Sequence, residues 1–347
     1  MKKILFLLSI VTLLFSCTNQ DVDFDDFAFQ SVYFPYQTPV RSLMLGDEVD
    51  GDNSIDLEHA FSIGVSIGGL YENKKDREVT VAFAPELASD ILNAAAGSEL
   101  ELLPPEYYNA TFDHITIPAG SFSGKLRVDL TDAFFEDSLT TGLQYIIPLK
   151  ITDAAGDSIL KGTAVSTVES PDPRIPENWV IQPKNYVLFG IKYINATHGV
   201  YLLRGKRTNT TANPQVTTTY STRFLDDNDM TKLTTKSLTE NYMPTVGGTN
   251  KESANPKYCM KLTFKSDDKS VIVSQKNASS VVVSGTGKYY SRNDTGAESY
   301  NGKKHRTVYL DYTYQDGGNT YHVNDSLVFV DTDMKFEVFT VRVVKQL

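Results

Sequence analysis

The side chains best suited to chemistry lie in one polar and aromatic stretch toward the end of the chain. It contains Tyr289, Tyr290 and Tyr300, with Arg292 and Asn293 between them. Sugars present flat C–H faces that stack on aromatic rings, and amide and guanidinium groups hydrogen-bond their hydroxyls. We therefore predict that this stretch binds a carbohydrate. The alternative is that the tyrosines fill or cover a β-barrel, where aromatic residues are common.

The only tryptophan, Trp179, is a further aromatic candidate. It lies in segment 168–190, which contains several prolines and polar residues and is typical of a semi-rigid connection between domains. We expect its ring to pack in the crease between two domains, with stacking on a ligand as the alternative.

Sequence signs of a catalytic or cofactor site are missing. The five histidines are scattered, and neither a His-Glu-x-x-His pair nor a Gly-x-Ser-x-Gly elbow occurs. An acidic segment over 50–58 invites a calcium interpretation, but Ile55 stands where an EF-hand needs glycine. We therefore expect a solvated acidic loop there, and a protein that is not an enzyme and has no cofactor and no metal site.

The start of the chain indicates where the rest must work. A short basic start precedes an apolar run over 4–15, which is too short to span a bilayer permanently. It therefore predicts a signal peptide over 1–16. The ending Leu14-Phe15-Ser16-Cys17 resembles the lipobox of bacterial lipoproteins, which implies cleavage before Cys17 and a lipid on its sulfur. An ordinary secretory signal is the alternative.

Residues 17–26 form a polar tether with four aspartates. An acidic stretch after the lipid cysteine resembles the surface-export signal of Bacteroidetes lipoproteins. That resemblance implies a lipid-anchored protein of the outer membrane that faces the cell exterior. The net charge of −10, without a basic run, excludes nucleic acid as a partner, because phosphate binding requires clustered Lys and Arg.

Short strands dominate the predicted first domain, residues 27–167. Segments such as 60–67 and 78–83 alternate apolar and small or polar residues with a period of two. Six or seven such strands predict an immunoglobulin-like β-sandwich. The one notable helix candidate is 86–96, between Pro85 and Gly97.

The order of several motifs in this domain resembles a known family. The motifs are Val32-Tyr33-Phe34-Pro35, Leu103–Tyr108, Ile115–Gly120 and Tyr145–Leu149. They are similar to the N-terminal domain of unknown function of Bacteroidetes surface lipoproteins, found in glycan-utilisation loci ahead of a glycan-binding module or a chitinase-like domain. The resemblance implies a cell-surface spacer or interaction domain and assigns no functional residues. The Asp-x-x-Asp-x-Asp-x-Glu signature of the chitinase-like domain is absent.

The predicted second domain, residues 191–347, follows the proline-rich joint over 168–190. It reads as strands and turns without a helix, which predicts closure into an antiparallel up-and-down barrel. The turn residues Asp316-Gly317-Gly318-Asn319 predict a hairpin. The opening strand Gly199–Gly205 and this closing hairpin resemble lipocalin-like C-terminal domains of related lipoproteins.

These features together predict a cell-surface glycan-binding lipoprotein that is accessory to a polysaccharide-uptake system. Its expected partners are a glycan, the outer-membrane lipid through Cys17, and a Sus-type uptake complex. Two alternatives stay open: a barrel that holds a small apolar ligand, and a structural or adhesive surface subunit without a small ligand.

Overall fold

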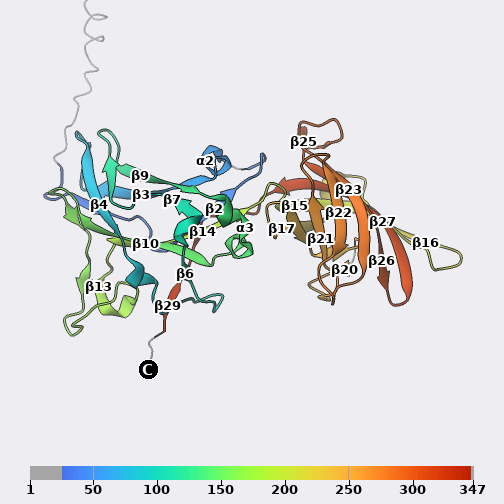
Figure 1. Ribbon diagram of the computed structural model, residues 1–347. Coiled ribbons are helices and arrows are strands. Elements are labelled where there is room, and N and C mark those ends of the chain that lie inside the picture. The colour runs from blue at the N-terminus through green and yellow to red at the C-terminus, as the bar shows by residue number, and fades with distance from the viewer. Residues whose placement is uncertain (1–25, 50, 249, 345–347) are drawn as a thin grey trace, which may run out of the picture.

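The chain folds as an all-β protein in two parts that lie side by side (Figure 1). The computed structural model describes residues 26–49, 51–248 and 250–344. The predicted signal peptide and the predicted tether up to residue 25, Cys17 included, lie outside the described residues. The all-β fold class predicted from the sequence is confirmed.

The N-terminal part consists of two curled sheets, each shaped like half a barrel. The first has the order β11-β1-β3-β9-β7, with bounds Ser158–Ile159, Ser31–Tyr33, Ala60–Gly68, Ser123–Leu130 and Tyr108–Asn109. The second has the order β28-β2-β14-β10-β4-β8, with bounds Glu337–Val338, Pro39–Met44, Tyr186–Ile194, Tyr145–Asp153, Arg77–Phe83 and His114–Ile117. Strand β6, Glu101–Leu102, pairs with β10. The pairs β1–β11, β2–β14 and β6–β10 are parallel.

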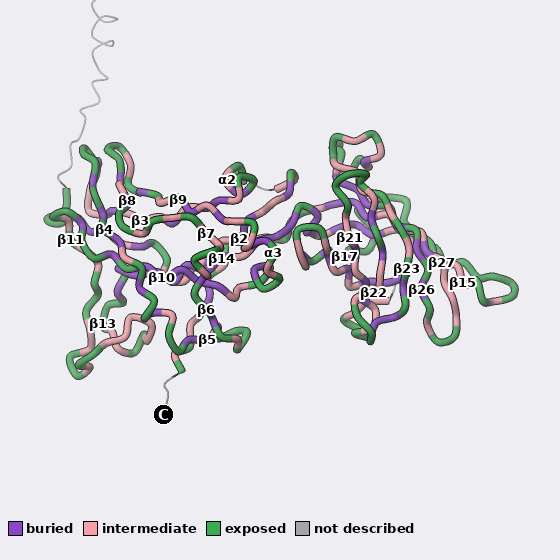
Figure 2. The backbone as a smooth tube through the Cα atoms, viewed as in Figure 1, coloured by how far each residue is buried: buried purple, intermediate pink, exposed green. Residues whose placement is uncertain are grey.

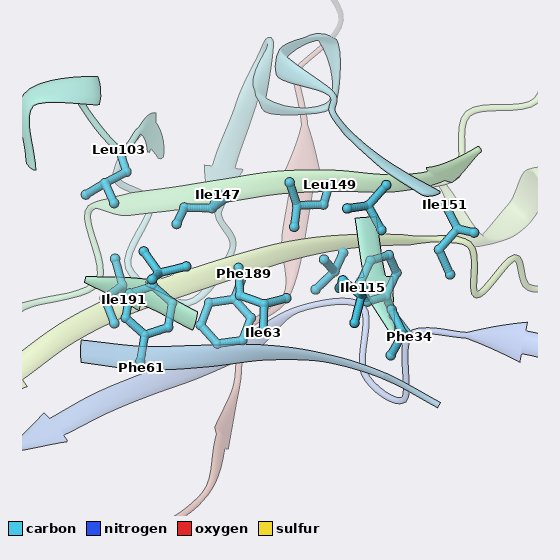
Figure 3. Packing of buried hydrophobic residues seen from close by; sticks show 14 of the residues in the cluster. Phe34, Phe61, Ile63, Leu103, Ile115, Ile147, Leu149, Ile151, Phe189 and Ile191 are labelled. Carbon is cyan, nitrogen blue, oxygen red and sulfur yellow. The ribbon is translucent and has the colours of Figure 1, made fainter. Parts of the chain in front are cut away.

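A hydrophobic core fills the space between these two sheets (Figure 3). Alternate residues of β3 are buried, so that Phe61, Ile63 and Val65 belong to this core. Ile147 and Phe189 meet them from the opposite sheet, and the rings of Phe61 and Phe189 stack with centroids 5.3 Å apart. Each such buried side chain contributes roughly 1.5–3 kcal/mol, so the alternation of β3 and its partners holds the sheets together.

Short elements surround the two sheets. The α-helices are α2, Ser54–Leu57, and α3, Asp132–Glu136, and the 3-10 helices are η1, Pro85–Ala88, η2, Pro105–Tyr107, η3, Ser138–Thr141, and η4, Pro176–Asn178. Two further strand pairs are β12, Thr163–Ala164, with β13, Trp179–Ile181, and β5, Ile91–Asn93, with β29, Val341–Val343.

The C-terminal part is a closed antiparallel barrel of eight strands. In chain order they are β15, Gly199–Asn209; β17, Asp229–Thr235; β18, Glu240–Met243; β21, Met260–Phe264; β22, Ser270–Gln275; β23, Val283–Tyr290; β26, Thr307–Asp316; and β27, Asn319–Asp331. Strand β27 pairs back onto β15, which closes the barrel. The smaller elements are β16, Val216–Tyr220, η5, Leu225–Asp227, and the ribbons β19–β20, Thr245–Val246 with Asn250–Lys251, and β24–β25, Glu298–Tyr300 with Lys303–His305. The predicted hairpin is confirmed, because Asp316 pairs with Asn319 between β26 and β27.

Side chains fill the interior of the barrel. Residues of β26 alternate between buried and exposed, as the tube in Figure 2 also shows along the barrel strands. Tyr201, Tyr312, Tyr314 and Phe329 lie in the barrel core together with many aliphatic side chains. A core packed with large aromatic rings argues against the alternative of an apolar ligand inside the barrel.

A buried carboxyl group lies among these barrel residues. Asp325, on β27, is 3% exposed, and its Oδ2 accepts a hydrogen bond of 2.8 Å from the Tyr312 hydroxyl. Its Oδ1 accepts a second bond from the Tyr220 hydroxyl. Burial raises the pKa of Asp325 to about 6, although the two hydroxyl hydrogen bonds act in the opposite direction. A Cβ at Gly205 would lie 3.0 Å from the Tyr220 ring, so the glycine leaves room for this contact.

The two parts are connected more closely than the predicted domain boundaries imply. The predicted boundary between the joint, 168–190, and the second domain, from 191, falls inside β14. This strand lies within the second sheet, between β2 and β10. The end of the chain also returns to the N-terminal part, where β28 pairs with β2 and β29 with β5. The residues of β14 are almost all buried, and such a run does not reveal which sheet buries it.

The helix expected over 86–96 is wrong. Only η1 is helical, and the residues after it form β5. Asp90 has a φ of 54°, which turns the chain out of the helix, and β29 then supplies backbone partners for β5. A strand from the far end of the chain thus overrides the local helix signal.

Candidate functional site

The predicted tyrosines of the barrel loop pack against different neighbours. Tyr289, at the end of β23, makes an edge contact with Phe264, with ring centroids 6.0 Å apart, and burial raises its pKa. The Tyr290 ring packs on Gly296 and makes an edge contact with Tyr309, with ring centroids 5.8 Å apart. Tyr289 and Tyr290 are thus half-buried packing residues.

The other residues of the predicted site are placed differently. Tyr300, on β24, packs against His305 on β25, with ring centroids 5.5 Å apart. Arg292 and Asn293 are exposed, and Arg292 lines a small crevice beside the N-terminal part. The loop therefore does not unite its three tyrosines in one stacking surface, and its role in binding stays a prediction.

Trp179 does not lie between the two parts, so the predicted interdomain position is wrong. It belongs to the β12–β13 ribbon, at the end of the N-terminal part away from the barrel (Figure 1). Its Nε1 donates a 2.8 Å hydrogen bond to the Asp172 carbonyl oxygen. It lines a cavity of about 450 Å³ together with Tyr186 and Pro173, both from the N-terminal part. The prolines of segment 168–190 lie against the sheet of the N-terminal part, and Pro171, Pro173 and Pro183 line this cavity. The segment therefore does not bridge to the barrel, which explains why Trp179 is not between the two parts.

A groove of about 500 Å³ lies in the N-terminal part. Its floor is apolar and includes Ile63, Val187 and Phe189. We call it the aromatic groove, and its lining is Phe34, Pro35, Tyr36, Pro39, Val40, Arg41, Ser42, Met44, Ile63, Gly64, Val187, Phe189, Thr332, Met334, Lys335 and Phe336. Small-molecule sites are typically concave, mostly apolar and about 300–1,000 Å³ in volume, with few polar groups.

Two exposed aromatic rings form part of the rim of the aromatic groove. Tyr36 is 53% exposed and Phe336 is 65% exposed. Their ring centroids are 4.7 Å apart and the ring planes meet at 51°. Tyr36 lies between β1 and β2, whereas Phe336 comes from the segment that leaves the barrel and leads to β28. Exposed aromatic rings in contact at a concave site are a typical platform for a flat ligand face.

An ion pair with a buried carboxylate fixes the polar side of the groove. Arg41, on β2, pairs with Asp56 of α2, and the backbone N–H of Met44 donates a 2.9 Å hydrogen bond to the same carboxylate. Burial raises the pKa of Asp56, while these two partners act in the opposite direction. A held guanidinium on the groove wall, with Ser42 beside it, can hydrogen-bond a ligand at a defined place.

Almost no local sequence pattern indicates this groove. Tyr36 stands between Pro35 and Pro39 in a segment that reads as a simple strand end. Phe336 follows it by 300 positions and lies within the predicted barrel domain, residues 191–347. Only the return of the chain to β2 brings the two rings together. The density of prolines around an isolated tyrosine is the one local signal that pointed to an exposed turn.

The junction between the two parts contains a second polar cluster. Glu48 reaches from the N-terminal part to the barrel, where its Oε2 accepts a 2.8 Å hydrogen bond from the backbone N–H of Arg306. Its Oε1 lies 3.1 Å from His305 Nδ1. The Arg306 guanidinium is fully buried, donates to the Tyr201 hydroxyl and the His198 carbonyl oxygen, and lies over the Phe329 ring.

Within 26–49, 51–248 and 250–344, no group of three or more His, Cys, Asp or Glu side chains is arranged to hold a metal ion. In the same part of the chain, the helices are all too short or too polar to cross a bilayer.

The fold and the groove define a class of two-part all-β proteins, in which a two-sheet unit precedes an eight-stranded barrel. A solved protein of unknown function from Bacteroides ovatus is similar over 92% of this chain and 100% of its own, with 30% identity and a TM-score of 0.81. The chain belongs to the same family as that protein. Residues 27–158 match a family model described as an N-terminal domain, and residues 196–333 match a domain of unknown function, DUF5627.

Other solved structures are much less similar. A second Bacteroides ovatus protein of unknown function has 17% identity and a TM-score of 0.43, covering 90% of this chain and 99% of its own. An auxiliary nutrient binding protein from Bacteroides thetaiotaomicron has 16% identity and a TM-score of 0.40, covering 83% of this chain and 89% of its own. No curated protein matches the chain.

Proposed function

We propose that the chain is a lipid-anchored protein of the outer membrane that binds a glycan in the aromatic groove. It faces the cell exterior and serves as an accessory to a polysaccharide-uptake complex. The observation that carries the proposal is the exposed pair of Tyr36 and Phe336 at the rim of a cavity of about 500 Å³.

The groove has the two features that carbohydrate recognition requires. The tilted rings of Tyr36 and Phe336 offer apolar faces for the C–H face of a sugar, each worth on the order of 1 kcal/mol. Arg41, Ser42 and Lys335 supply hydrogen-bond donors beside the rings for the sugar hydroxyls. Affinity at one such site is modest, and many copies on a cell surface would raise the avidity.

The anchor is proposed on the lipobox-like sequence before Cys17. A Cys17→Ala variant should lose lipid labelling and leave the membrane fraction, because a single polar tether has no affinity for lipid. Retention of the variant in that fraction at wild-type level would contradict the anchor.

Glycan binding is tested with a soluble chain that starts at Asp21, which retains every described residue. A glycan array identifies the ligand, and titration calorimetry then compares the wild type with a Tyr36→Ala, Phe336→Ala double variant. The variant should bind at least tenfold more weakly, since two stacking contacts of on the order of 1 kcal/mol each are removed. Its melting temperature should change little, because both rings are largely exposed.

Two matched variants locate the site. Phe224→Ala removes an aromatic ring that is 59% exposed on the barrel part, and it should bind like the wild type. Tyr290→Ala with Tyr300→Ala tests the loop predicted from the sequence. Loss of binding in this loop variant alone would place the site in the loop and overturn the groove. A wild-type chain that binds no glycan would favour the structural or adhesive alternative.

A further inference from the structure

A second cavity, the junction crevice, lies where the two parts meet and has a volume of about 210 Å³. Its lining residues come from both parts of the chain: Glu48, Val49, Arg292, Lys303, His305, Phe329, Val330, Asp331 and Thr332. Five of these nine residues have titratable side chains, whereas the lining of the aromatic groove is mostly apolar.

The junction crevice and the aromatic groove share one wall. Thr332 lines both cavities. Before Thr332, the end of β27 contributes Phe329 to the crevice, and after it, the segment that leaves β27 contributes Phe336 to the groove. An elongated ligand that follows this segment can therefore reach both cavities.

The charged side chains of the crevice differ in how many hydrogen bonds they already make within the protein. Glu48 is buried and uses both oxygens, one on the Arg306 backbone N–H and one beside His305. Asp331 accepts a 2.7 Å hydrogen bond from the backbone N–H of Asp333.

Arg292 and Lys303 are the cations of the crevice that remain exposed to solvent. Arg292 is 3.7 Å from an Asp47 carboxylate that is itself about half exposed, a distance too long for a hydrogen bond. A guanidinium and an ammonium with little internal pairing favour an anionic ligand group, a carboxylate or a sulfate.

We propose that the junction crevice is a second subsite, which binds the anionic group of an acidic glycan through Arg292 and Lys303. The inference rests on the proposed function, because the neutral rings of the same glycan occupy the aromatic groove. It names the substrate class: an oligosaccharide that carries a uronic acid, a sialic acid or a sulfate ester. His305 lies between Glu48 and the Tyr300 carbonyl oxygen and is held in the wall.

The test compares Arg292→Gln, Lys303→Gln and their double variant with wild type, all as the soluble chain from Asp21. The probes are oligogalacturonates, sulfated chondroitin oligosaccharides, sialylated oligosaccharides, and neutral cello-, malto- and xylo-oligosaccharides of matched length. Lys304→Gln is the control, because it removes the same charge one residue away, and Lys304 instead donates to the Asp294 carbonyl oxygen. Calorimetric titrations are made at low salt and at about 0.5 M salt, which screens exposed charges.

We expect at least one acidic series to bind wild type more tightly than the neutral series, with a preference that weakens in high salt. The double variant should lose about tenfold in affinity for that acidic series and none for the neutral ones. Comparing the affinities for the uronate, sialate and sulfate probes shows which anion the crevice prefers. Lys304→Gln should bind like the wild type.

Three results would overturn the proposal. In the first, the double variant binds the acidic probes as tightly as wild type, so the crevice is not the subsite. In the second, wild type binds neutral probes alone, so the proposed function stands and the acidic specificity fails. In the third, wild type binds none of the probes, and the proposed function itself fails with it.

Discussion

Asp325 should make the stability of the protein fall as the pH rises from about 4 to about 6. The carboxyl group titrates near 3.8 in an unfolded chain, and burial raises its pKa to about 6 in the fold. Between these values the folded protein keeps a proton that the unfolded chain has released. The free energy of unfolding therefore decreases with rising pH through this window and stays level above it.

The size of the effect follows from the pKa difference. A displacement from 3.8 to about 6 corresponds to roughly 3 kcal/mol between the two ends of the window. An Asp325→Asn variant carries no charge at any pH, so this contribution should vanish. At pH 4 the protonated carboxyl and the amide each have one carbonyl oxygen that accepts, but the amide N–H₂ group replaces the carboxyl O–H beside a tyrosine hydroxyl, so at pH 4 we expect the variant to be about 1 kcal/mol less stable than wild type. Near pH 7 the deficit should disappear or reverse.

Urea unfolding followed by circular dichroism at pH 4, 5, 6 and 7 measures the difference between wild type and Asp325→Asn at each pH. Taking this difference cancels the contributions of the other carboxylates. Asp311→Asn is the control, since Asp311 lies on the neighbouring strand β26 with its side chain 64% exposed. If Asp325→Asn and wild type lose stability in parallel across the window, the buried carboxyl does not have the raised pKa and the reasoning is wrong.

Three further predictions concern packing and the junction. Tyr290→Ala with Tyr300→Ala should lower the melting temperature by several degrees, because both rings pack against neighbours; an unchanged thermal melt would show that they are free surface groups. Glu48→Gln should cost about 1–3 kcal/mol in urea unfolding, because one of its two acceptors at the junction is lost, and an unchanged midpoint would refute this. The fragment 196–333 contains all eight barrel strands and should unfold cooperatively, whereas one that starts at 184 should aggregate, because it carries β14 without its sheet; equal behaviour of the two in size-exclusion chromatography would contradict this.

Local patterns were sufficient to predict the barrel. Its strands follow one another in the chain, so alternation along segments such as β26 and the turn Asp316–Asn319 carry most of the information. The same reasoning located the longer strands of the N-terminal part, such as β3 and β4. It failed where a strand pairs with a distant one, as β14 does with β2 and β5 with β29, because period and propensity say nothing about the partner.

The candidate site was harder to predict for the same reason. The loop around Tyr290 was favoured because its aromatic and polar residues are adjacent in the sequence. In the fold, however, the rings of Tyr290 and Tyr300 pack against different neighbours, Tyr309 and His305. Tyr36 and Phe336 lie at opposite ends of the chain and meet at 4.7 Å. A surface assembled from distant segments leaves no local pattern, so only the three-dimensional structure could identify it.

The segment that contains Thr332 links the barrel to binding in the aromatic groove. It leaves the last barrel strand, lines the junction crevice, then lines the groove, and ends as β28 on the edge of the second sheet. The groove consequently needs the barrel in place, because the barrel and Glu48 together fix where this segment begins. A barrel whose interior is filled can thus contribute to binding without holding a ligand itself, by positioning the wall that carries Phe336 against Tyr36.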